Sequence, residues 1–192
     1  MSENIDHLLT AYNLGELEKV KSDFRCETRD VFRARHDRWF NQLEKEIGVS
    51  KAALILTVIG EVGNNCYDHN LGHWNDLPGL CFYQEKGFAL LFDCGRGIEA
   101  SLSSAGFKFD SEKSYLMAAL TQRITGRAPE RRGNGLKVSL EAVESLGIGF
   151  YIRSGQSEYK NQKMNHPYCE KVSSFASKGV LMMLDFRNLY EN

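Results

Sequence analysis

The chain has 192 residues, of which 42% are apolar, enough for one domain whose core needs no disulfides. Lysines and arginines number 24 against 25 aspartates and glutamates, so the charge balance gives no sign of a nucleic-acid or membrane partner. The five cysteines are an odd number and lie far apart, which favours reduced thiols. We see no pattern typical of a signal peptide or a transmembrane helix and expect a cytoplasmic protein.

Residues 1–48 predict a helical extension that packs on the rest of the domain. Ile5, Leu8 and Leu9 have helical spacing, and the stretch from Asn13 to Gly15 interrupts it. A second, longer helix has a broad apolar face, made of Phe32, Trp39, Phe40, Leu43 and Ile47. Gly48 ends this helix. We expect residues 49–192 to form the main domain.

The main domain alternates helical and strand patterns. The sequence predicts helices over 51–70, 111–124 and 134–146, a hairpin of strands 80–83 and 88–92, and later strands over 150–153 and 180–186. This order is typical of the α/β class. It predicts a two-layer sandwich, in which a mixed β-sheet has helices packed on one face.

The first polar motif lies on the helix predicted over 51–70. Glu61, Asn65 and Asp68 are spaced i, i+4, i+7 and form one stripe, beside an apolar stripe made of Ile55, Ile59, Val62 and Cys66. An asparagine amide oxygen suits Mg²⁺, and a glutamate one turn earlier could accept a proton from a water or a hydroxyl. The alternative is a solvated helix face. His69, Asn70 and His73 follow directly, and such a group of side chains is unusual for an ordinary solvated helix face.

The second motif directly follows the apolar strand of residues 88–92. Asp93 could accept a hydrogen bond from an exocyclic amine, and Gly95 and Gly97 would let the backbone approach a planar ring. The alternative is a strand-to-helix turn in which the aspartate is a cap.

The third motif opens the helix predicted over 134–146. Gly133 and Gly135 permit close approach of a phosphate to free backbone N–H groups, and Arg131, Arg132 and Lys137 add positive charge. The alternative is a glycine-containing loop that caps a helix.

In this order, segments 61–69, 93–97 and 132–136 resemble the N box and the two glycine boxes of the GHKL superfamily of ATP-binding domains, which includes gyrase, histidine kinases and MutL. The resemblance covers about residues 50–187. It implies a Bergerat-type fold with ATP and Mg²⁺ as cofactors. It implies that Asn65 is a ligand of Mg²⁺, that Glu61 is the general base and that Asp93 contacts the amino group of adenine. The other ATP-binding residues it implies are Asp68, His69, Gly95, Gly97, Arg131, Arg132, Gly133, Asn134, Gly135, Leu136 and Lys137.

The resemblance also implies a lid over the triphosphate at about residues 125–132, from which Arg127 could reach the phosphates. Two positions depart from the pattern of many relatives. Lys137 stands where they have a further glycine, and Val180 stands where they have a threonine next to adenine.

Two histidine patterns have other interpretations. Cys66, His69 and His73 have a spacing that zinc could use, but Cys66 belongs to the apolar stripe. His36 faintly resembles the phosphoacceptor of a histidine kinase, but a dimerising hairpin does not fit between His36 and Glu61. We favour a surface histidine at position 36.

The short chain is similar in style to the stand-alone anti-sigma serine/threonine kinases. That resemblance implies transfer of the γ-phosphoryl group of ATP to a serine or threonine of a partner protein. The alternative is a non-catalytic, nucleotide-responsive module that binds a protein partner. The sequence leaves open whether the chain forms a homodimer.

Overall fold

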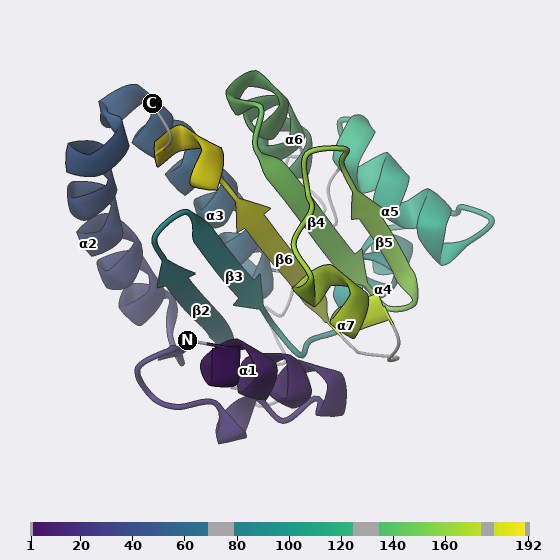
Figure 1. The fold of residues 1–192 in the computed structure, drawn as a ribbon. Helices are drawn as coiled ribbons and strands as arrows, with labels where there is room; N and C mark the ends of the chain where they lie inside the picture. The colour runs from purple at the N-terminus through teal and green to yellow at the C-terminus, as the bar shows by residue number, and fades with distance from the viewer. Residues whose placement is uncertain (1, 69–78, 125–134, 174–178, 191–192) are drawn as a thin grey trace.

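The computed structural model describes residues 2–68, 79–124, 135–173 and 179–190 (Figure 1). In chain order the elements are α1 (Ser2–Leu14), η1 (Leu17–Lys19), β1 (Arg25–Cys26), α2 (Arg29–Ile47), α3 (Val49–Asp68), β2 (Leu80–Glu85), β3 (Phe88–Phe92), α4 (Gly97–Ser104), α5 (Glu112–Thr121), α6 (Gly135–Leu146), β4 (Gly149–Ser154), β5 (Ser157–Lys160), α7 (Tyr168–Ser173), β6 (Val180–Asp185) and η3 (Arg187–Tyr190).

The strands form one open sheet in the order β1-β2-β3-β6-β4-β5. Each strand pairing among the described residues is antiparallel, which corrects the expectation of a mixed sheet. The reason is the position of β6. Strands β3 and β4 run in the same direction, which the long connection through α4, α5 and α6 allows, but β6 lies between them and runs opposite to both.

Helices α2, α3, α5 and α6 cover one face of this sheet (Figure 1). The apolar stripe of α3 is fully buried against it, as its spacing predicts. Phe32 and Trp39 of α2 reach the same core, where each ring packs edge-on against Phe82 with centroids 5.7 Å apart. The predicted α/β class, a β-sheet with helices packed against it, is confirmed.

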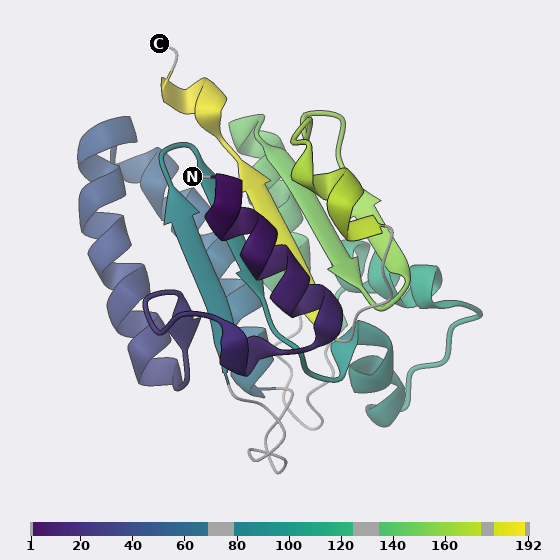
Figure 2. The same ribbon diagram turned by 60° about the horizontal axis from the view of Figure 1, so that its bottom comes forward.

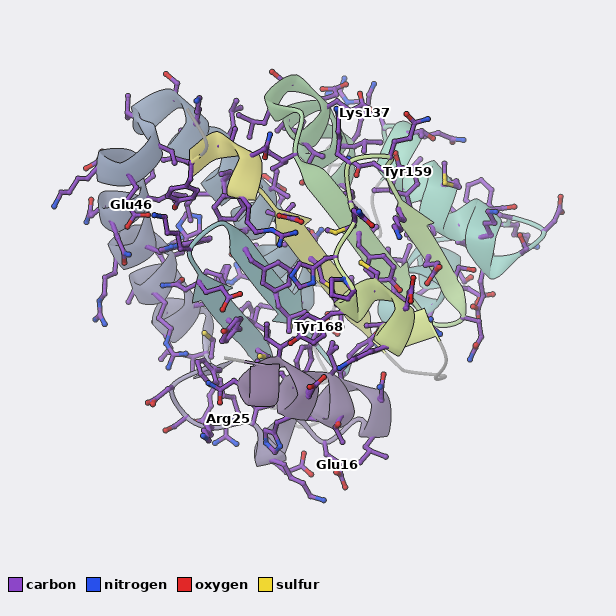
Figure 3. All side chains as sticks on the ribbon, viewed as in Figure 1. Glu16, Arg25, Glu46, Lys137, Tyr159 and Tyr168 are labelled. Atoms are coloured by element: carbon purple, nitrogen blue, oxygen red, sulfur yellow. The ribbon has the colours of Figure 1, made fainter. Side chains whose placement is uncertain are left out.

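Helices α1 and α7 cover the opposite face, so the expectation of helices on one face only is corrected (Figure 2). Tyr168 of α7 packs on this second core (Figure 3). Strand β3 explains why both faces need cover. Phe88, Leu90 and Phe92 point toward the α1 side, whereas Ala89 and Leu91 point toward α3, and all five are buried. An uninterrupted apolar strand indicates two covered faces.

Six elements have no counterpart in the sequence-based prediction: η1, β1, α4, β5, α7 and η3. They are short, and β5 alternates half-buried and exposed polar residues, so no apolar period marks it. Among the described residues, no helix combines the length and the apolar composition needed to cross a bilayer.

Candidate functional site

The polar stripe of α3 lies beside the start of α6. The two helices pack side by side, and Gly135 is the first residue of α6. A methyl group at Gly135 would lie 2.3 Å from Oε2 of Glu61, so this carboxylate lies directly against the backbone of Gly135. The fold therefore brings part of the first motif into contact with part of the third.

Asn65 and Asp68 continue the stripe toward the end of α3, and both are partly buried. Asp68 forms an ion pair with Arg29, the first residue of α2. Sequence reasoning missed Arg29. A signal was present, because a cation at the first position of a helix opposes the helix dipole and so suggests an anion from another element.

Asp93 follows β3 and is only 6% exposed. Its Oδ1 accepts a hydrogen bond of 2.7 Å from the backbone N–H of Gly95, and its own backbone N–H donates to the carbonyl of Val180 at 2.9 Å. Burial raises the pKa of Asp93 to about 6, although hydrogen bonding of the carboxylate to the backbones of Gly95 and Val180 acts against the rise. A buried carboxylate with a raised pKa is a recognised sign of a functional site.

The surroundings of Asp93 leave no space for a side chain at Gly179. A methyl group there would lie 2.1 Å from the backbone oxygen of Asp93 and 2.9 Å from its Oδ1. On the α3 side, Cys66 is buried and its thiol donates to the carbonyl of Gly79 at 3.6 Å. Burial raises the pKa of the Cys66 thiol, and the nearby Asp93 carboxylate raises it further. Asp93 is thus close to the α3 residue that follows Asn65.

Gly97 begins α4 next to the end of β4. A methyl group at Gly97 would lie 2.9 Å from Oγ of Ser154, which accepts a 2.8 Å hydrogen bond from the backbone N–H of Ile98. Sequence reasoning also missed Ser154, which anchors the α4 start. An open hollow of about 340 Å³ lies beside it, lined by Arg96, Glu99, Ala100, Ser103, Glu112, Ser154 and Gly155. Its mixed charges favour no single class of ligand.

The two other α6 residues of the third motif, Leu136 and Lys137, lie in different environments. Leu136 packs on the main core. Lys137 is 42% exposed, lies at the edge of the molecule and pairs with Glu141 at 3.8 Å (Figure 3). His69, Arg131, Arg132, Gly133 and Asn134 lie outside the described residues, as do Arg127 and the expected lid.

The two other histidine patterns have the following outcomes. His36 is partly buried and its Nε2 lies 2.8 Å from the carbonyl of Leu56, so the ring links α2 to α3. For the zinc pattern, His69 and His73 lie outside the described residues. Within the described ranges, no three side chains of His, Cys, Asp or Glu gather closely enough to hold a metal ion.

Comparisons with models of protein families, with curated proteins and with solved structures find no match to this chain. The resemblance to the GHKL superfamily therefore remains a prediction made from the three sequence motifs.

Proposed function

We propose that the chain binds ATP with Mg²⁺ and transfers the γ-phosphoryl group to a serine or threonine of a partner protein. The observation that carries this proposal is the contact between Glu61 and Gly135. It brings the polar stripe of α3 to the N-terminal end of α6, which attracts anions. The buried carboxylate of Asp93 lies near Cys66 of α3, close enough for its charge to raise the pKa of that thiol.

Each residue has a role in this proposal. Asp93 would accept a hydrogen bond from the adenine amine, and the backbone at the start of α6 would hold phosphate oxygens. The amide oxygen of Asn65 is a ligand that Mg²⁺ accepts, and the ion would neutralise charge on the phosphates. Glu61 would take the proton of the attacking hydroxyl, whose oxygen bonds to the γ-phosphorus while the bond to the β–γ bridging oxygen breaks and ADP leaves.

Binding is tested first, by calorimetric titration of the protein with ATP in Mg²⁺. We expect saturable binding by the wild type and by Glu61→Ala, because the proposed base does not hold the nucleotide. Glu144→Ala, which removes an exposed glutamate from α6, is the matched control. Loss of ATP binding in Glu61→Ala alone would assign Glu61 to binding instead of catalysis.

Transfer is tested with ATP labelled in the γ-phosphate, using proteins encoded by neighbouring genes as acceptors. We expect label on a serine or threonine of one acceptor with the wild type and with Glu144→Ala, and none with Glu61→Ala. Binding without transfer by the wild type would favour the non-catalytic binding module. A wild type that does not bind ATP would rule out both functions.

A further inference from the structure

Arg29 and Asp68 form an ion pair where the start of α2 meets the end of α3. A helix has partial positive charge at its N-terminus and partial negative charge at its C-terminus, so each side chain is unfavourable on its own helix. Helices α2 and α3 are joined by Gly48 alone and pack antiparallel, so each charge complements the end of the other helix. The ion pair thus offsets two unfavourable placements by joining the two helices.

The residues around this pair also attach the last turn of α3 to the β1–α2 segment. The hydroxyl of Tyr67 donates to the carbonyl of Cys26 at 2.8 Å and to that of Thr28 at 3.1 Å. The guanidinium of Arg29 lies 5.8 Å from the centre of the Tyr67 ring. These contacts come from residues far apart along the chain, so they hold the end of α3 from outside the helix.

One turn earlier, the same segment approaches the helix backbone. A methyl group at Gly63 would lie 2.2 Å from Cζ of Phe32, so this glycine lets the α2 ring pack directly on α3. Gly63 and Tyr67 are spaced i, i+4 and therefore share one face of α3. Glu61 and Asn65 share another. Asp68 belongs to the polar stripe and also pairs with α2, so it links the two faces.

We infer that Arg29 is a positioning residue for the metal end of the nucleotide site, an inference that rests on the proposed function. Asn65 and Asp68 are both in the last turn of α3, where a helix frays unless it is held. The ion pair keeps that turn in place and so fixes the direction in which Asn65 presents its amide oxygen. Residues that orient a metal ligand in this way typically change metal affinity by about 10- to 100-fold.

The test is a set of ATP titrations, each done once in Mg²⁺ and once in EDTA, on wild type, Arg29→Gln, Asp68→Asn and the double variant. In Mg²⁺, we expect Arg29→Gln to weaken ATP binding about tenfold. In EDTA, its affinity should match the wild type, because adenine and phosphate contacts lie elsewhere. The double variant should be no weaker than the weaker single variant, since both changes break one pair.

Two further variants serve as controls. Arg33→Gln removes an exposed arginine one turn further along α2 and should behave as the wild type. Arg29→Lys keeps the charge and should recover most of the Mg²⁺-dependent affinity. Circular dichroism checks that Arg29→Gln folds. If it does not fold, Arg29→Lys becomes the deciding comparison, and its affinity for ATP in Mg²⁺ should fall about threefold because the planar fork of the guanidinium is gone.

Three results would overturn the inference while leaving ATP binding intact. They are unchanged Mg²⁺-dependent affinity in the Arg29 variants, equal losses in Mg²⁺ and in EDTA, and additive losses in the double variant. The second would mean a merely structural ion pair, and the third would mean that Asp68 acts on the ligand independently of Arg29. A wild type that binds no ATP under either condition would instead remove the proposed function and this inference with it.

Discussion

Two carboxylates of the candidate site differ in how the fold surrounds them. Asp93 is buried after β3 among backbone groups, and burial raises its pKa to about 6. Asp68 ends α3 and pairs with the guanidinium of Arg29. The first is a charge that the fold stabilises poorly, whereas the second already has its counter-charge.

The comparison shows how each carboxylate could serve one site. Ionising Asp93 in the free protein costs free energy, and an approaching hydrogen-bond donor can recover part of that cost. Asp68 already pairs with Arg29, so a ligand would recover no such free energy there. Its contribution is to hold the helix that carries Asn65. The following predictions test this difference, from the largest expected effect to the smallest.

The largest effect is expected at Gly179, which confines Asp93 from the β6 side. Its φ is +87°, and a methyl group would overlap the backbone of Asp93, so Gly179→Ala should lower the free energy of unfolding by about 3 kcal/mol. Gly106→Ala is the matched control. Gly106 has a φ of +91°, but apart from its chain neighbours no atom of the described residues lies within 4 Å of the place that a methyl group would take, so only the backbone cost of about 1 kcal/mol is expected. Urea unfolding measures both, and equal losses would contradict the packing argument.

The raised pKa of Asp93 predicts a specific dependence of stability on pH. Between pH 4 and pH 6 the folded protein binds more protons than the unfolded chain, so the stabilising contribution is present at acid pH and lost as the pH rises through about 6. The free energy of unfolding of the wild type should fall relative to Asp93→Asn by about 2 kcal/mol from pH 4 to pH 7. Urea titrations of both proteins check this. A constant difference between them would show that Asp93 has an ordinary pKa.

Ligand binding should follow the opposite trend. If adenine binds the ionised form of Asp93, lowering the pH from 7 to 5 should weaken binding of a non-hydrolysable ATP analogue by about tenfold, because most of the carboxylate is then protonated. Asp93→Asn, measured in parallel, corrects for protonation of the nucleotide itself. If the ratio of the wild-type affinity to the variant affinity is the same at both pH values, the ionised carboxylate of Asp93 does not contact adenine.

A smaller effect is expected at the α3 end. Tyr67→Phe removes the hydroxyl that donates to the carbonyls of Cys26 and Thr28, and should lower the free energy of unfolding by about 1 kcal/mol. Tyr159→Phe is the control, because the Tyr159 hydroxyl has no hydrogen-bond partner within the part of the chain that the structure describes (Figure 3). Thermal or urea unfolding compares them. An equal loss in both would mean that Tyr67 does not fasten the end of α3.

Much of the fold was predictable because it depends on short-range patterns. The apolar stripe of α3 and the apolar run of β3 have the periods of a buried helix and a buried strand, and both are buried as expected. The second covered face was missed, although the unbroken run from Phe88 to Phe92 was a usable signal for it. The antiparallel sheet could not be predicted, since it depends on β6 inserting between two strands that are distant in sequence.

The candidate site divides in the same way. The sequence by itself determined that Glu61, Asn65 and Asp68 share one helix stripe and that Asp93 ends a strand, because spacing along one element decides such relations. Only the tertiary structure decided that Gly135 contacts Glu61 and that Arg29 pairs with Asp68. Those contacts join separate elements, and their partners follow from how whole helices pack against each other and the sheet, which no local period encodes.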